Sequence, residues 1–119
     1  MSKDNRVYYD EGDDSLTFIS GSSKAKYSVS KGLFILSFNE KDELVAVEFM
    51  GAHEKFEIPK KVLKNLKKAE LKVKCSDQKN MIIKMQLHYS KQQDYNIVTS
   101  VENESAVCKN QMLKATVSA

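Results

Sequence analysis

Apolar and polar residues alternate one by one along much of this chain, and this period of two constrains the fold more than any other feature. Successive side chains of a β-strand point to opposite faces of the sheet, so such alternation is typical of half-buried strands. Lys72 and Lys74, for example, separate three inward positions. The inward positions of the second half are Leu71, Val73, Cys75, Met81, Ile83, Met85, Leu87, Tyr89, Tyr95, Ile97, Thr99 and Val101.

The first half predicts a meander of shorter strands separated by polar turns. Leu33 to Phe38 is apolar on nearly both faces, which favours a central, covered strand. The tail from Ala106 to Val117 is compatible with one or two edge strands or with a partly loose segment. The other expected strands of this half are Arg6 to Tyr9, Ser15 to Ser20, Lys24 to Val29 and Leu44 to Met50.

One amphipathic helix is expected over residues 57–69. Pro59 suits a first helical position because its missing N–H has no partner there in any case. At 100° per residue, four apolar residues fall on one face and five lysines on the opposite face. The apolar residues are Val62, Leu63, Leu66 and Ala69, and the lysines are Lys60, Lys61, Lys64, Lys67 and Lys68.

These elements together predict an α+β fold. We expect a curved, mostly antiparallel sheet of about seven to nine strands, packed on the single helix. The 119 residues suit a single domain over 1–119, with a β meander at 7–52, the helix at 57–69 and further strands at 70–117.

Charge is distributed unevenly along the chain. Residues 1–56 carry 7 Lys/Arg against 10 Asp/Glu, a net −3, whereas residues 57–119 carry 12 against 6, a net +6. Within the basic half, residues 60–74 contain seven lysines and a single acidic residue, Glu70. This composition predicts a surface that binds phosphate backbones without base specificity. The alternative is a solvated lysine face. The seven are Lys60, Lys61, Lys64, Lys67, Lys68, Lys72 and Lys74.

No familiar catalytic, cofactor or metal motif is present in the sequence. Cys75 and Cys108 lie 33 positions apart without nearby histidine ligands, so we expect two reduced, strand-borne thiols, with a disulfide as the alternative. His53 and His88 are expected at the surface. The start resembles no secretory signal and no apolar run would span a membrane, which favours the cytoplasm.

An acidic turn at Asp10, Glu11, Asp13 and Asp14 could hold a hard cation, but its spacing is not that of a calcium loop. The alternative is a turn whose aspartates accept hydrogen bonds from local backbone N–H groups. With Tyr9 and Leu16, this turn gives the pattern Y-D-x-x-x-D-x-L. A glycine and apolar strand (Gly32, Ile35, Leu36), the segment Leu44 to Phe49 and the pair Gly51-Ala52 follow it.

In these features the chain resembles a small prokaryotic family, the domain of unknown function numbered twenty-two eighty-three, over about residues 7–52. The resemblance implies an antitoxin-like or accessory protein, since such domains are often encoded beside small ribonuclease-like toxins. Ala46 departs from the glycine that is common in the family, and nothing after Ala52 has a counterpart.

The functional prediction is therefore a non-catalytic, cytoplasmic binding protein without cofactor, and not an enzyme. Asp10, Asp13 and Asp14 would face a protein partner, either a small toxin-like protein or a second copy that pairs at an exposed sheet edge. The alternative is a nucleic-acid-associated protein that uses the seven lysines. An enzyme whose site is assembled from distant residues ranks third.

Overall fold

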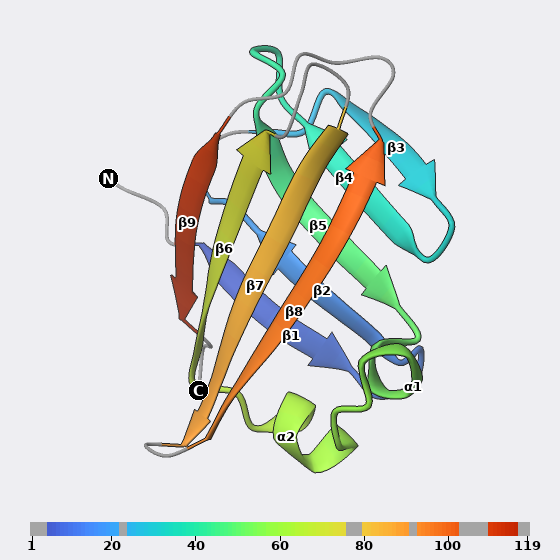
Figure 1. The fold of residues 1–119 in the computed structure, drawn as a ribbon, viewed down its shortest axis with the longest axis vertical. Helices are drawn as coiled ribbons and strands as arrows, with labels where there is room; N and C mark the ends of the chain where they lie inside the picture. The colour runs from blue at the N-terminus through green and yellow to red at the C-terminus, as the bar shows by residue number, and fades with distance from the viewer. Residues whose placement is uncertain (1–4, 22–23, 76–79, 91–92, 103–109, 117–119) are drawn as a thin grey trace.

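Nine strands form one continuous sheet that folds back on itself into two layers, with β1–β5 behind and β6–β9 in front (Figure 1). The computed structural model describes residues 5–21, 24–75, 80–90, 93–102 and 110–116. The strands are β1 (Arg6–Asp10), β2 (Ser15–Ile19), β3 (Tyr27–Lys31), β4 (Phe34–Phe38), β5 (Leu44–Met50), β6 (Lys68–Cys75), β7 (Asn80–Ser90), β8 (Gln93–Glu102) and β9 (Gln111–Thr116).

The order of the strands is β3-β4-β5-β2-β1-β9-β6-β7-β8. All neighbours are antiparallel except β1 and β9, which join the two layers through the parallel pair Arg6 and Thr116. Because this junction is short, the layers are held together mainly by the side chains between them. The two outer strands of the order, β3 and β8, are the edges of the sheet.

The hydrophobic core fills the space between the two layers. Phe18 and Phe49 of the rear layer and Leu71 and Leu87 of the front layer are fully inaccessible to solvent. In β6 the inward residues are buried while the lysines between them are exposed, which is the alternation read from the sequence. Burial of each such large apolar side chain contributes about 1.5–3 kcal/mol.

The predicted fold class is wrong in its helical part. Two short helices, α1 (Ala52–Phe56) and α2 (Lys60–Lys64), lie at one end of the layers, and no single amphipathic helix covers the sheet within the described residues (Figure 1). The molecule is mostly antiparallel β-structure. The apolar side of α2 is still buried, through Val62 and Leu63.

Two causes end α2 five residues earlier than predicted. Asn65 follows the helix, and its side-chain amide donates a hydrogen bond of 2.7 Å to the Lys61 carbonyl. Lys68 then begins β6, which is paired with β7 on one side and β9 on the other. Pairing of both edges of a strand outweighs the modest helix propensity of the lysines.

The expectation of reduced cysteines is also wrong for Cys75, which is disulfide-bonded. The other cysteine of the chain, Cys108, lies outside the described residues, as do positions 106–109 and 117 of the ambiguous tail. No helix in the described segments has the length and apolar character needed to cross a membrane.

Candidate functional site

The seven predicted lysines do not share one surface. Lys60, Lys61 and Lys64 are exposed on α2, and Lys67 lies in the link after it. The remaining three, Lys68, Lys72 and Lys74, are on the outer face of β6. The predicted helical face of five lysines therefore does not form, since only Lys60, Lys61 and Lys64 are helical.

One of the helical lysines is paired inside the molecule. The Lys64 ammonium lies 3.3 Å from the Glu11 carboxylate of the acidic turn, with both side chains about half exposed. An ion pair this exposed contributes at most about 1 kcal/mol. It nevertheless neutralises part of the charge that the sequence assigned to the α2 surface.

The lysines of β6 meet a further lysine on the neighbouring strand. Lys72 lies directly opposite Lys84 of β7, and both side chains are exposed. On the other side Lys72 faces Met112 of β9, while Lys84 faces Val98 of β8. Two lysines are thus flanked by aliphatic side chains that are 58% and 63% exposed, respectively.

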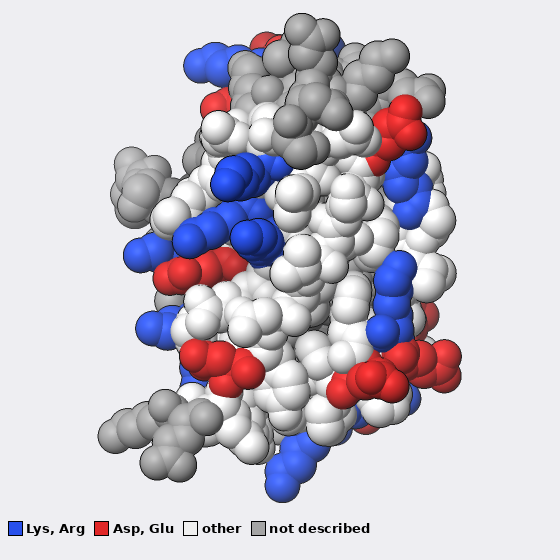
Figure 2. Space-filling view, in the orientation of Figure 1, with Lys and Arg blue, Asp and Glu red and all other residues white. Residues whose placement is uncertain are grey.

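The adjacent row across the same strands is polar. Lys114, Glu70, Gln86 and Asn96 follow one another from β9 to β8. The Lys114 ammonium lies 3.8 Å from the Glu70 carboxylate. Figure 2 shows the resulting group of basic side chains over the front layer, with acidic atoms at its lower border.

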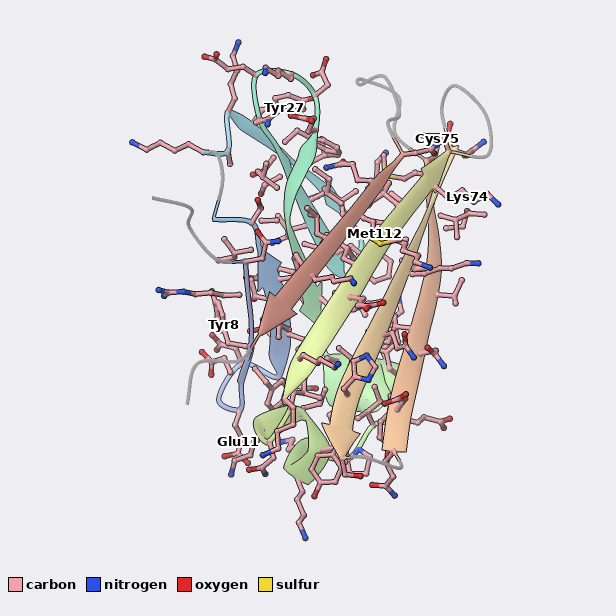
Figure 3. All side chains as sticks on the ribbon, turned by 90° about the vertical axis from the view of Figure 1, so that its left-hand side faces the viewer. Tyr8, Glu11, Tyr27, Lys74, Cys75 and Met112 are labelled. Carbon is pink, nitrogen blue, oxygen red and sulfur yellow. The ribbon has the colours of Figure 1, made fainter. Side chains whose placement is uncertain are left out.

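We call this surface the lysine face and define it by Lys72, Lys74, Lys84 and Lys114 together with Glu70. In Figure 3, Lys74 projects from the outer side of the front layer, away from the rear layer that carries Tyr8. Of the residues that the structure describes, none forms an ion pair with Lys72, Lys74 or Lys84. Like charges placed directly opposite on adjacent strands destabilise a sheet.

A shallow hollow of about 210 Å³ opens beside the lysine face. Ligand pockets of whole drug-sized molecules usually measure about 300–1,000 Å³, so this hollow suits a small anion or one part of a larger ligand. Its lining combines two cations, one carboxylate, two amides and apolar walls. The lining residues are Glu70, Lys72, Lys84, Met85, Gln86, Asn96, Ile97 and Val98.

A larger hollow of about 610 Å³ lies at the end of the rear layer away from α1 and α2, between the β2–β3 and β4–β5 links. Three lysines and two glutamates line it, a net charge of +1 that equals that of the two lysines and one glutamate lining the smaller hollow. Asn39, on its wall, accepts hydrogen bonds from the N–H groups of Lys41 and Glu43 and so shapes the β4–β5 link. The smaller hollow differs in geometry, because its two lysines lie directly opposite each other on adjacent strands.

The acidic turn serves the fold. The Asp10 carboxylate accepts hydrogen bonds from the N–H groups of Gly12, at 2.9 Å, and Asp13, at 3.3 Å. Asp14 sits in the left-handed region, with φ of 50°. The alternative given above, a turn whose aspartates accept local backbone hydrogen bonds, is confirmed for Asp10, while Asp13 is exposed beside it.

Asp14 joins this turn to α1. Its carboxylate accepts hydrogen bonds from the Tyr9 hydroxyl and from the His53 N–H, and its carbonyl accepts one from Ala52. Partial desolvation raises the pKa of Asp14, but the bonds from Tyr9 and from the N–H groups of His53 and Glu54 outweigh it and hold the pKa below its usual value. Desolvation, together with the bond to Asp14, raises the pKa of Tyr9.

Both histidines are partly buried, which differs from the expectation that they lie at the surface. His53 Nδ1 lies 2.7 Å from the Ile58 carbonyl, and His88 Nδ1 lies 2.8 Å from the Asp94 carboxylate. Within the described segments, no group of three or more His, Cys, Asp and Glu side chains could hold a metal ion. The lysine face is therefore the surface with the clearest chemical character.

The sequence predicted only part of this surface. Lys72 and Lys74 were identified as exposed neighbours on one strand, whereas Lys84 and Lys114 were missed. Lys84 occupies an outward position of the alternating segment 81–89, so the sequence pattern indicates that its side chain points away from the core. Its position opposite Lys72 depends on strand register, which the sequence pattern does not specify.

Comparison with known proteins gives one relevant similarity. No family model matches the chain, and no solved structure matches it. Over 83 residues the chain is 29% identical to a protein of Methanosarcina mazei named "Putative hypoxanthine phosphoribosyltransferase". The match covers 70% of this chain and 67% of the relative.

This similarity changes the functional interpretation. The relative bears the name of an enzyme, which contradicts the prediction of a non-catalytic, antitoxin-like binding protein and conflicts with the prediction that the chain is not an enzyme. The resemblance to the family numbered twenty-two eighty-three stays a prediction, as does the role of Asp10, Asp13 and Asp14 in partner binding.

Proposed function

We propose that the lysine face binds a phosphorylated sugar, specifically a compound that carries a phosphoribosyl group. The observation that carries this proposal is the pair of exposed lysines, Lys72 and Lys84, that lie directly opposite each other beside a hollow. A phosphate between them would relieve their mutual repulsion and accept a charge-assisted hydrogen bond from each ammonium group. The name of the Methanosarcina mazei relative refers to transfer of the same group.

The other polar residues that line the hollow would bind the sugar of such a ligand. The Glu70 carboxylate would accept hydrogen bonds from ribose hydroxyls, as acidic residues do in other nucleotide sites. Gln86 and Asn96 supply amide donors and acceptors on the same wall. The volume of about 210 Å³ suits one phosphorylated sugar and leaves a larger substituent outside the hollow.

The proposal concerns binding, which is the first requirement of any transfer reaction. A lysine pair around the 5-phosphate would hold the ribose in place for a reaction at its first carbon, which is a positioning role. Glu70 is the ionisable carboxylate of the lining and would be the group to test for proton transfer.

Calorimetric titration with ribose 5-phosphate tests the proposal. We expect binding to the natural chain and no binding of ribose, which lacks the phosphate. The double variant Lys72→Gln/Lys84→Gln should bind at least about tenfold more weakly, since each charge-assisted hydrogen bond contributes about 1.5–3 kcal/mol.

The matched control is Lys60→Gln/Lys61→Gln, which removes the same charge from exposed positions on α2. This control should bind like the natural chain at constant ionic strength. Equal binding by the two double variants, or no binding of ribose 5-phosphate at millimolar concentration, would refute the proposed site.

A further inference from the structure

Strand β8 ends the front layer and exposes one edge of its backbone. It pairs with β7 alone and is the last strand in the sheet order. The register shift of this pair lies between His88 and Ser90, at the start of β8, so the rest of the strand is regular. Its alternate N–H and C=O groups on the free side have no partner strand among the described residues.

The composition of β8 lacks the usual protection of such an edge. Between Asp94 and Glu102 the strand reads Tyr-Asn-Ile-Val-Thr-Ser-Val, without charge, proline or glycine. Natural edge strands usually carry lysine, proline or a bulge, or they are short, because an open edge pairs with other chains. The ten residues of β8 have none of these features in their central part.

The other edge of the same sheet shows the contrast. Strand β3 has five residues and ends in Lys31, and Lys26 precedes it. One edge of the sheet is therefore short and flanked by charge, whereas the other is long and uncharged. Figure 2 shows uncharged atoms over the part of the front layer beside the basic group.

We propose that β8 pairs in antiparallel fashion with β8 of a second copy of this chain. The charge pattern favours this occupant, since self-pairing places the uncharged stretch of one copy against that of the other. Opposed residues must point to the same face, because a slip by one residue would place the core face of one copy beside the outer face of the other. Only registers that match outward residues with outward residues are therefore compatible.

Charge selects among those registers. A pairing centred on Val98 would set Asp94 of each copy opposite Glu102 of the other, and directly opposed like charges are unfavourable. A pairing centred on Ile97 sets Asp94 opposite Ser100 and keeps most of the strand paired. We therefore assign the register centred on Ile97, which brings the exposed Val98 beside Asn96 of the second copy.

The dimer would place both lysine faces on the same side of one continuous layer. Lys84 lies one strand away from β8, so three strand spacings of about 4.8 Å would separate the two β7 strands. This arrangement does not depend on the proposed ligand, and its test is made without ligand. Failure of one proposal therefore leaves the other unaffected.

Sedimentation equilibrium over a wide concentration range tests the inference on the full chain. We expect the mass to rise from the monomer value of 13.5 kDa to twice that value. Val98→Lys should raise the dissociation constant at least about tenfold, since it places like charges of the two copies at diagonally opposed positions on the outer face of the paired strands.

Met112→Lys is the matched control. Met112 is similarly exposed on the same outer face and also faces a lysine, but β9 is an internal strand of the sheet. The control variant should dimerise like the natural chain. Equal weakening by both substitutions, or no effect of Val98→Lys on a dimer that forms, would assign dimerisation to another surface and overturn the inference.

Hydrogen exchange supplies a second measurement that does not rely on a variant. Alternate amides between Gln93 and Glu102 should exchange more slowly as the natural chain passes from monomer to dimer, while those of β3 should not change. A mass of 13.5 kDa at every concentration would refute self-pairing.

Discussion

Asp14 shows how much of the fold depends on one side chain. It occupies a left-handed backbone position, which aspartate and asparagine tolerate better than most residues. From there its carboxylate binds the Tyr9 hydroxyl of β1 and the His53 N–H at the start of α1. The first turn of α1 has no side-chain cap from its own N-cap residue, Gly51, so Asp14 fills that role from a distant turn.

We expect Asp14→Asn to lower the free energy of unfolding by about 1–2 kcal/mol at neutral pH, since it weakens a helix cap and a charge-assisted hydrogen bond. Asparagine keeps the backbone conformation, so the loss reports on the carboxylate. Urea unfolding of both proteins measures it. Asp13→Asn, at the exposed neighbouring position, should change stability by less than about 0.5 kcal/mol.

The pH dependence of this difference follows from the pKa of Asp14, which is lower in the folded chain than in the unfolded one. A carboxyl of this kind stabilises the fold above its unfolded pKa of about 3.9, and the contribution is lost as pH falls through the folded pKa. The natural chain and Asp14→Asn should therefore converge in stability below that pH. A difference that stays constant down to pH 2 would contradict the role of the charge.

At the scale of single elements, the α2–β6 boundary separates local preference from tertiary pairing. The segment from Pro59 to Ala69 has helical spacing of its apolar residues, yet Lys68 and Ala69 are extended. The same Ala69 satisfies both patterns, because it ends a helical stripe and begins an alternating one. Pairing with β7 and β9 places Ala69 in a strand and not in the helix.

Reduction of the Cys75 disulfide should destabilise the chain by about 2–4 kcal/mol, because the bond restricts the unfolded state near the end of β6. Urea unfolding with and without a reducing agent measures the effect. The Cys75→Ser variant should match the reduced chain and should not respond to the reducing agent. An identical unfolding midpoint under oxidising and reducing conditions would rule out a stabilising disulfide.

At the scale of the whole molecule, the two layers share one core and should unfold together. Leu71 is inaccessible to solvent between the layers, so Leu71→Ala should cost about 2–5 kcal/mol. Met112→Ala, on the outer face, should cost less than about 0.5 kcal/mol. Calorimetry should show a single transition for both variants, and two separated transitions would mean that the layers fold independently.

The lysine face shows which structural features a sequence pattern predicts and which it does not. Alternation predicted that Lys72 and Lys74 share an exposed face, since the period of a strand is a local property. It could not predict that Lys84 stands opposite Lys72, because register between strands depends on the turn and on packing against the second layer.

The β-rich character, the inward and outward faces of β6–β8 and the turn at Asp10 could all be predicted from the amino-acid pattern, because they arise from residues close in the chain. Tertiary structure alone decided where α2 ends, how β1 and β9 join the layers and which lysines meet. Those features depend on pairing between segments far apart in sequence, where the free energy gained by two paired strand edges and a shared core exceeds that of local preference.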